Sequence, residues 1–218
     1  MYRCFMIVKT PPEPATRTRQ KRSLATERKL TAAVLSLLDE GGLAACTAPA
    51  IAQQAGVAVG TIYARYADKD ALIAAALLDL VSLAGSDAED RFSGWAARSA
   101  DLADFLGAVT RAALETTRDH RIFLVAIREF VRRRPDEAWR GRFAAEQGRA
   151  RELIAQGAVR RFGASARGGE ASLRMALLAI YGAIELAWLD PTAGLFQAPP
   201  DPEAFIAALV DMQTRYLT

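Results

Sequence analysis

The sequence predicts an all-α protein with a small N-terminal helical domain, a larger C-terminal helical domain and about nine helices. Of its 218 residues, 51% are hydrophobic, which is enough for a packed core. Alanine and leucine are abundant, and the long Val, Ile and Thr alternation typical of strands is missing. Apolar residues recur instead at helical spacing between breaks that contain Gly or Pro. These three observations favour helices throughout.

Four helices are predicted in the first third of the chain. Apolar residues at helical spacing predict the first over residues 23–40, where Gly41 and Gly42 end it. Thr47 is a good N-cap for a second, short helix that ends at Gly56. The spacing of apolar residues then predicts a short third helix, and a fourth follows it directly.

The third helix is predicted over residues 59–66, and Asp68 caps the fourth, which runs from Lys69 toward Leu83. The stretch 85–99 is rich in Gly, Ser and Asp and is predicted to be a loop. Five further helices are predicted over residues 101–117, 121–134, 136–162, 170–189 and 202–217.

Charge divides the chain unevenly. Residues 1–72 hold ten Lys and Arg against six Asp and Glu, whereas the remainder holds 18 against 19. A basic first third suits a polyanion partner. Prolines and basic residues before Ser23 predict a flexible basic arm over residues 1–22, either a solvated tail or a contact to the minor groove or phosphates of DNA. We therefore divide the chain into this arm, a domain over 23–72 and a larger domain over 73–218.

Composition also restricts the location of the protein. Its two cysteines, Cys4 and Cys46, form no disulfide framework, and no signal-peptide core follows the N-terminus. The richest apolar run, Met175–Leu189, is interrupted by Glu185 and is shorter than the ~20 residues that a membrane span needs. We expect a cytoplasmic protein with no membrane association.

The second and third predicted helices have the spacing of a helix-turn-helix. Such a motif needs a small residue where the helices cross, here Ala52, and a residue with free φ in the turn, here Gly56. Apolar residues must then lock the two helices together. The predicted core of the motif is Ile51, Ala52, Ala55, Gly56, Val57, Ile62 and Tyr66.

The order of residues between 25 and 73 resembles the tetracycline-repressor (TetR/AcrR) family. The matching segments are Ile51-Ala52, Ala55-Gly56-Val57, Gly60-Thr61-Ile62-Tyr63, Tyr66, Lys69-Asp70 and Leu72, after a first helix with glycines near its end. The resemblance implies a three-helix DNA-binding domain joined by a fourth helix to a domain that binds a small-molecule effector. It also implies a homodimer on a near-palindromic operator in double-stranded DNA.

The third predicted helix is the one expected to enter the major groove. The resemblance implies that Thr61 and Tyr63 give hydroxyls to phosphate or base, and that Lys69 and Thr47 contact the backbone. The predicted DNA-binding residues are Thr47, Val59, Gly60, Thr61, Tyr63, Arg65 and Lys69. The family commonly has a capping serine where Ala58 stands and a polar residue where Val59 stands. We assign specificity to packing of the Val59 methyls on a thymine methyl, with help from Thr61.

The effector pocket is expected in the larger domain. Its predicted lining is Trp95, Phe105, Phe123, Ile127, Phe143, Tyr181, Glu185 and Trp188. Ordinary core packing explains most of these residues equally well, so they support only a partly hydrophobic effector.

Glu185 interrupts an apolar helix face, where an unpaired buried charge would be costly. We rank pairing with an arginine such as Arg128 first and ligand recognition second, and exposure to solvent is a third interpretation. His120, the only histidine, lies beside Asp119. We assign it to capping or to the surface, because no second histidine completes a metal site.

Two C-terminal helices carry the predicted dimer interface. Small residues alternate with Leu and Ile between Leu173 and Leu189, and such faces let helices approach closely in a four-helix interface from two subunits. The predicted dimer seam is Ala179, Gly182, Ala183, Phe205, Leu209 and Met212. The alternative is an internal hairpin, which would leave a large apolar face exposed.

We predict no enzyme, no cofactor and no metal. The sequence has no paired Cys and His spacing, no phosphate-binding glycine loop and no nucleophile motif. The predicted function is a sequence-specific regulator of transcription, most commonly a repressor that an effector releases. The alternative is a helical adaptor that keeps the fold without specific DNA binding; Ala58 and Val59 favour it, and Thr61, Tyr63 and Lys69 oppose it.

Overall fold

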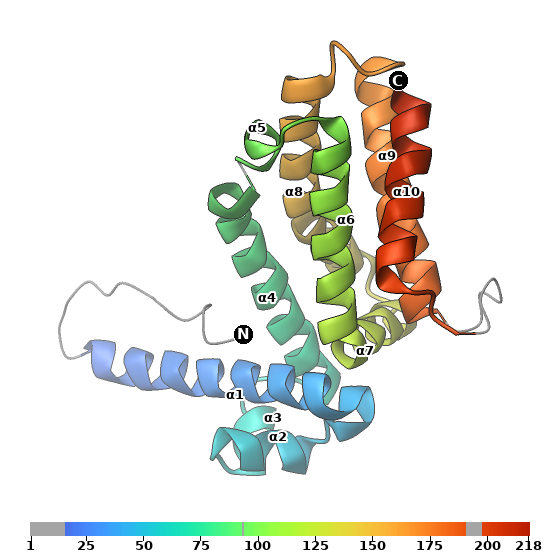
Figure 1. Ribbon diagram of the computed structural model, residues 1–218. Coiled ribbons are helices and arrows are strands. Elements are labelled where there is room, and N and C mark those ends of the chain that lie inside the picture. The colour runs from blue at the N-terminus through green and yellow to red at the C-terminus, as the bar shows by residue number, and fades with distance from the viewer. Residues whose placement is uncertain (1–15, 93, 191–197) are drawn as a thin grey trace.

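The computed structural model describes residues 16–92, 94–190 and 198–218, and this part of the chain contains ten α-helices, one π-helical turn and no strand (Figure 1). The all-α prediction is confirmed. The elements are α1 (Thr16–Ala45), α2 (Ala48–Ala55), α3 (Val59–Tyr63), α4 (Lys69–Phe92), α5 (Trp95–Arg98), α6 (Leu102–Asp119), α7 (Arg121–Arg133), α8 (Glu137–Phe162), α9 (Gly169–Ile184), η2 (Glu185–Leu189) and α10 (Pro202–Leu217).

The first helix is longer than predicted at both ends. Residues 16–22 belong to α1, so the prediction of a flexible arm is wrong there, while residues 1–15 lie outside the described residues. The basic stretch is also rich in Arg, Lys and Gln, which are good helix formers, and this propensity outweighs their mutual repulsion. At the other end Gly42 leaves the helical region, with φ 66°, but helical structure continues to Ala45.

Two other predicted boundaries are wrong. The stretch 85–99 is not a loop, because α4 continues to Phe92 and α5 follows at Trp95. A glycine inside a helix costs only about 1 kcal/mol relative to alanine, which does not stop a long helix with earlier turns that are well packed. Helix α3 ends at Tyr63 rather than residue 66, although the Tyr66 N–H still donates to the Ile62 carbonyl at 2.9 Å.

The helices enclose two hydrophobic cores. Figure 1 shows α1 lying across the base of the molecule over α2 and α3, with α6, α8, α9 and α10 standing side by side above. The lower core joins α1–α4 to α7 and the start of α8. Its large buried members include Leu30, Val34, Leu38, Ile51, Ile62, Leu72, Ile73, Leu77, Phe123, Phe130, Trp139 and Phe143.

The upper core is built by α5, α6, the second half of α8, α9, η2 and α10. Its members include Phe105, Leu106, Ile154, Phe162, Leu173, Ile180, Trp188, Ile206 and Leu217. The sequence-based division after residue 72 does not coincide with the cores, because α7 and the start of α8 pack with the N-terminal helices. Helix α8 therefore contributes to both cores and connects them.

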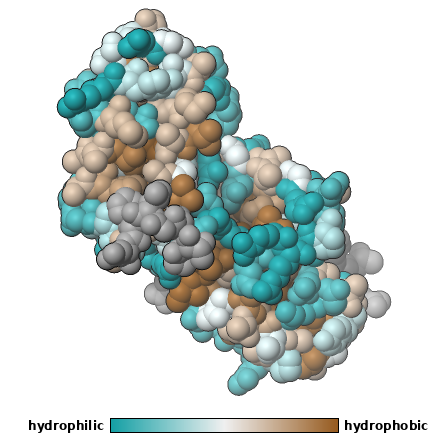
Figure 2. Space-filling view, turned by 90° about the vertical axis from the view of Figure 1, so that its right-hand side faces the viewer, coloured by the Kyte–Doolittle hydropathy of each residue, from teal (hydrophilic) through white to brown (hydrophobic). Residues whose placement is uncertain are grey.

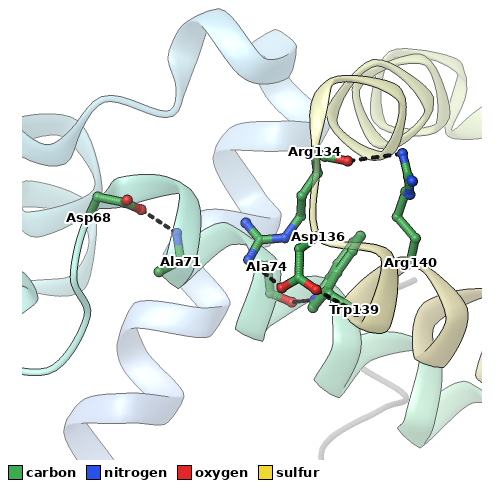
Figure 3. A network of polar contacts seen from close by, with 7 residues as sticks. All are labelled: Asp68, Ala71, Ala74, Arg134, Asp136, Trp139 and Arg140. Carbon is green, nitrogen blue, oxygen red and sulfur yellow. Dashed lines mark hydrogen bonds and ion pairs between the residues drawn. The ribbon is translucent and has the colours of Figure 1, made fainter.

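Trp139 fixes the start of α8 against α4 (Figure 3). Its indole Nε1 donates to the buried Ala74 carbonyl at 3.0 Å, and its ring stacks on Phe143 with 5.0 Å between centroids. Asp136 caps α8 by accepting from the Trp139 N–H at 2.9 Å, and the Arg134 guanidinium lies over the Trp139 ring. These contacts join the start of α8 to α4.

The stretch Gly169–Leu189, formed by α9 and η2, is long and apolar enough to cross a membrane by length and composition alone. This stretch is longer than the run Met175–Leu189 from which the sequence predicted no membrane span. About 33% of the most apolar window is buried inside the structure, where it packs against α6, α8 and α10. Because the rest of this apolar window is not buried within the chain, the stretch leaves one side open to a partner.

Candidate DNA-binding face and ligand cavity

The turn between α2 and α3 has helix-turn-helix geometry. Thr47 caps α2, since its Oγ1 accepts from the Ala50 N–H at 3.2 Å. Gly56 then takes the left-handed conformation, with φ 65° and ψ 41°, which glycine adopts without the steric cost of a Cβ. This brings the Val57 N–H within 2.9 Å of the Ala52 carbonyl.

The predicted motif core packs as one unit. Ile51, Ala52, Ala55 and Ile62 are buried in the lower core, and Val57 and Tyr66 are half-buried against it. Burial raises the pKa of the Tyr66 phenol, and nearby Glu27 and Asp79 add to the effect. These contacts hold α3 in a single orientation on α1, α2 and α4.

Helix α3 presents one side to solvent. Tyr63 is 56% exposed and Val59 is 38% exposed, while Thr61 is half-buried. Nothing lies within 4 Å of the position that a Cβ on Gly60 would take, so a ligand backbone can approach here. Thr47 is exposed as well, and half-buried Lys69 has its Nζ 3.2 Å from the Asp70 carboxylate. Arg65 is exposed too, so all seven predicted DNA-binding residues remain accessible.

Exposed Arg65 also makes a contact within the chain. Its Nη1 donates to the Ser23 Oγ of α1 at 2.8 Å, which ties the end of α3 to the first helix. Sequence patterns gave no signal for this contact, because the two residues are 42 positions apart. Ala58 occupies the N-cap position of α3 in an extended conformation and makes no side-chain cap, as its methyl group requires.

A cavity of about 840 Å³ lies where the two cores meet. Ile127 and Phe143 reach it from the lower core, and Val109, Ile154 and Ile184 reach it from the upper core. Five of the eight predicted pocket residues line it, namely Trp95, Ile127, Phe143, Tyr181 and Glu185.

The other three predicted pocket residues do not line this cavity. Phe105 packs on Phe162 in the upper core, with 5.6 Å between ring centroids, and Phe123 is buried in the lower core. Trp188 packs edge-on against Phe205, with 4.7 Å between centroids. Their aromatic character reflects core packing, which composition alone does not distinguish from a ligand site.

Charged residues of the cavity were largely missed by sequence patterns. Arg128 and Arg132 of α7 and Arg140 and Arg151 of α8 all line it. Glu185 starts the π-helical turn and its Oε1 lies 3.2 Å from the Arg128 Nη1, which matches the pairing ranked first from the sequence. The sequence did contain one indication of a basic site, because Arg128 and Arg132 are one helical turn apart and so share a face of their helix.

The side of the molecule formed by α9, η2 and α10 carries an apolar area. Met175, Leu178, Leu186, Met212 and Tyr216 make up half of the ten large hydrophobic residues that are exposed in the described chain. Figure 2 looks onto this side and shows apolar atoms gathered over its upper part. We call these five residues the α9–α10 face.

The predicted dimer seam falls partly on this face. Met212 is a member of it, and Ala179, Gly182 and Ala183 lie half-exposed on α9. Leu209, however, is buried within the chain, and Phe205 packs on Trp188. The exposed members on α9 and η2 follow helical spacing, from Met175 to Leu178 and Leu186, and this periodicity would have identified them.

The cysteine thiol and the histidine imidazole lie in surroundings that explain them by packing and by a contact within the chain. Cys46 is fully buried, and burial raises the pKa of its thiol to about 11, so the thiol stays protonated at neutral pH. His120 lies at the junction of α6 and α7 with its Nδ1 3.4 Å from the Asp39 carboxylate. No group of three or more His, Cys, Asp or Glu side chains with metal-site geometry occurs among the residues that the structure describes.

Comparison with known proteins agrees with this arrangement. Residues 30–76 match the family described as bacterial regulatory proteins, tetR family. No curated protein sequence is a significant match to the chain. The fold resembles that of FadR from Bacillus subtilis in complex with stearoyl-CoA, at 15% identity and a TM-score of 0.61, covering 88% of this chain and 99% of that one.

Two further solved structures extend the likeness. A putative TetR-family regulator from Mesorhizobium loti is 15% identical with a TM-score of 0.63, covering 89% of this chain and 96% of that one. GusR from Salmonella enterica is 22% identical with a TM-score of 0.51, over 89% and 96% of the two chains. At these identities the likeness concerns the fold. The family match over residues 30–76 shows that the helix-turn-helix segment is of the tetR type, and over the rest of the chain the likeness to TetR-family regulators is one of fold.

Proposed function

We propose that this protein is a cytoplasmic transcriptional repressor that binds a near-palindromic operator as a homodimer and is released when a small molecule fills the cavity between its cores. The observation that carries the proposal is the solvent-facing side of α3 above a turn closed by Gly56. That arrangement offers a helix to the major groove on a rigid support.

The chemistry of the α3 side suits DNA. Tyr63 and Thr47 supply hydroxyl groups for phosphate oxygens, and Lys69 supplies a positive charge at the start of α4. The Val59 methyl groups suit a thymine methyl in the major groove, where that group distinguishes thymine from the other bases. Because Arg65 is bonded to Ser23, we expect it to orient α3 rather than to contact a base.

The place of the cavity suits an effector. A ligand there contacts Phe143, which stacks on Trp139, and Trp139 is hydrogen-bonded to α4. Helix α4 begins at Lys69, directly after the helix-turn-helix. Ligand binding that repacks Phe143 and Trp139 would therefore shift the DNA-binding helices, which is the requirement for release.

The α9–α10 face suits a second copy of the chain. An exposed apolar strip on two adjacent helices is costly in water, and two such strips related by a twofold axis bury each other in a four-helix interface. A dimer then presents two α3 helices to two half-sites, as a palindromic operator requires.

The test is selection of random duplex DNA by the purified full chain, followed by affinity measurements at fixed salt for wild type and Tyr63→Ala. We expect an enriched inverted repeat that binds two protomers per site. We expect Tyr63→Ala to bind this DNA at least about tenfold more weakly, because the substitution removes one charge-assisted contact in each half-site. Ala64→Ser, which changes an exposed residue beside Tyr63, is the matched control.

Recovery of no motif, with weak salt-sensitive binding that Tyr63→Ala leaves unchanged, would contradict the proposal. That result would favour the adaptor, for which the uncapped α3 and the apolar Val59 are the supporting observations.

A further inference from the structure

We infer that the cavity between the two cores binds an amphiphilic anion, with its carboxylate or phosphate group held by Arg128, Arg132 and Arg140 and its apolar body along α6, α8 and α9. The inference rests on the proposed function, in which this cavity is the effector site, and it adds the chemical class of the ligand.

The charge of the lining is the first argument. Four arginines line the cavity, and Glu185 is its only acidic residue among those described. Glu185 faces Arg128, so three positive charges remain without a neutralising carboxylate inside the cavity. Such a concentration of one sign favours an anion and repels a cation.

The unused donors of the arginines are the second argument. The Arg128 Nη1 lies 3.2 Å from Glu185 but is buried without a hydrogen bond, since the geometry of that pair is poor. Arg140 donates to the Arg134 carbonyl at 3.2 Å, and its other nitrogen lies 3.6 Å from the exposed Glu137.

Arg132 and Arg151 have no ion pair with any carboxylate in the described part of the chain. Arg151 lies over the Tyr181 ring at 4.8 Å from its centroid. A guanidinium group has five N–H donors in a planar fork that fits a carboxylate or a phosphate, and much of this capacity is free here.

The position of the arginines locates the charged group. Helices α7 and α8 meet at Pro135, and Arg132 and Arg140 stand on either side of that junction, with Arg128 one turn before Arg132. Arg151 lies 11 residues beyond Arg140 on the same helix, which is about 16 Å along its axis. The three arginines near the junction therefore form one end of the site.

The rest of the lining is apolar. It includes Val109, Ala113, Ile127, Phe143, Ile154 and Ile184. This surface excludes a small hydrophilic anion as a tight ligand, because affinity for it would rest on the arginines alone in an open, hydrated site. A molecule with both an acidic group and an apolar body uses both parts of the cavity.

The experiment measures binding to the full chain, without DNA, of ligands that share a ten-carbon chain and differ in the polar group. These are decanoate, decyl phosphate, decanol and decyltrimethylammonium, all below their micelle concentrations, with acetate as the anion that lacks the apolar body. We expect decanoate or decyl phosphate to bind at least about tenfold more tightly than decanol or the cation, as one charge-assisted hydrogen bond supplies. Acetate should not bind, and the preference between the two anions identifies the acidic group.

Variants then test the location. Arg132→Gln combined with Arg140→Gln should remove most of the preference for the anion over decanol, while Arg149→Gln should keep it, because Arg149 pairs with Glu146 on α8 outside the cavity. Equal affinity for decanoate and decanol in wild type would overturn the inference, and so would an anion preference that survives in the double variant.

The wild-type series does not depend on the stability of any variant. Operator binding that decanol releases as readily as decanoate would overturn the inference and leave the proposed function standing. Selective anion binding by a chain that recognises no operator would do the reverse.

Discussion

The helices around the lower core and those around the upper core differ in how their exposed apolar side chains are distributed. Around the lower core, the exposed large hydrophobic residues are spread over several helices, with Ile122 on α7 and the neighbours Val59 and Tyr63 on α3. Around the upper core five of them gather on the α9–α10 face, on α9, η2 and α10. The lower core therefore exposes few large apolar side chains on any one helix, whereas the upper core exposes five on one side, the side that we propose a second copy of the chain covers.

This difference matches two separate requirements of the proposed function, a firmly positioned DNA-binding helix and a surface for association. The lower core holds α3 and must be rigid, because an interface with DNA loses affinity when its helix is poorly positioned. In the proposed dimer the upper core supplies the interface, and its exposed apolar area is the source of the association energy. The arginine-lined cavity lies between them, where a ligand contacts both.

The largest effect is expected from Leu178→Arg on the α9–α10 face. Leu178 is 64% exposed in the single chain, and burying a leucine side chain contributes about 1.5–3 kcal/mol, twice over in a symmetric dimer. The substitution should raise the dimer dissociation constant by at least about 100-fold. Sedimentation velocity over a range of protein concentrations measures it.

Ile122→Arg is the matched control, because Ile122 is 51% exposed on α7 and lies outside the α9–α10 face. A wild-type protein that is monomeric at every concentration would contradict the comparison, as would equal dissociation by the two variants.

The second prediction breaks the lower core. Trp139→Ala removes a buried ring that packs between Phe130 and Phe143, together with its hydrogen bond to Ala74. Replacement of a buried aromatic residue by alanine costs about 3–5 kcal/mol of the free energy of unfolding. Chemical denaturation at fixed protein concentration gives this value.

Trp139→Phe keeps most of the packing and loses the donor to Ala74, so its cost should be about 1–3 kcal/mol. A loss below 1 kcal/mol for Trp139→Ala would show that α8 is not held to α4 in the way that Figure 3 depicts.

A third, smaller effect concerns the turn. Gly56 has φ 65° and open space around it, so the cost of Gly56→Ala is purely conformational, about 1–2 kcal/mol. Gly60 also has open space but lies within α3. Gly60→Ala should therefore not destabilise the fold and should weaken DNA binding instead, because the new methyl group projects toward the major groove. Thermal denaturation and operator affinity separate the two variants, and equal stability losses would contradict this account.

The helix-turn-helix was predictable because its determinants are local. Thr47, Ala52 and Gly56 act through capping, a close helix crossing and a left-handed turn, each of which depends on residues within a few positions. The fold class followed from the apolar periodicity in the same way. The extent of α4 was missed because the Gly and Ser content of residues 85–99 was weighted above the continuity of the helix.

The cavity was only partly predictable because its lining comes from six helical segments, α5 to α9 and η2, that meet in space. Phe105, Phe123 and Trp188 have the same composition signal as Phe143 and Tyr181, yet they pack in cores. The arginines of the cavity were missed for the opposite reason, because their residue type gave no indication of a ligand site. On the sequence they resemble ordinary solvent-facing charges, and only the turn between α7 and α8 at Pro135 brings Arg132 and Arg140 to one cavity.

The smallest effect is predicted for a substitution that adds a side-chain N-cap to α3. Ala58 already has the extended backbone of an N-cap, with φ −73° and ψ 146°, but no side-chain acceptor for the first N–H groups of α3. Ala58→Ser supplies a hydroxyl oxygen for the Gly60 or Thr61 N–H and should stabilise the chain by about 0.5–1 kcal/mol. Ala64→Ser at the other end of α3, where the backbone is helical, should give no such gain. If both serines change the free energy of unfolding equally, capping of the first turn of α3 does not stabilise the chain. The position of α3 then depends on the burial of Ile62 alone. In that case the lower core is held by its buried side chains and not by contacts at its surface.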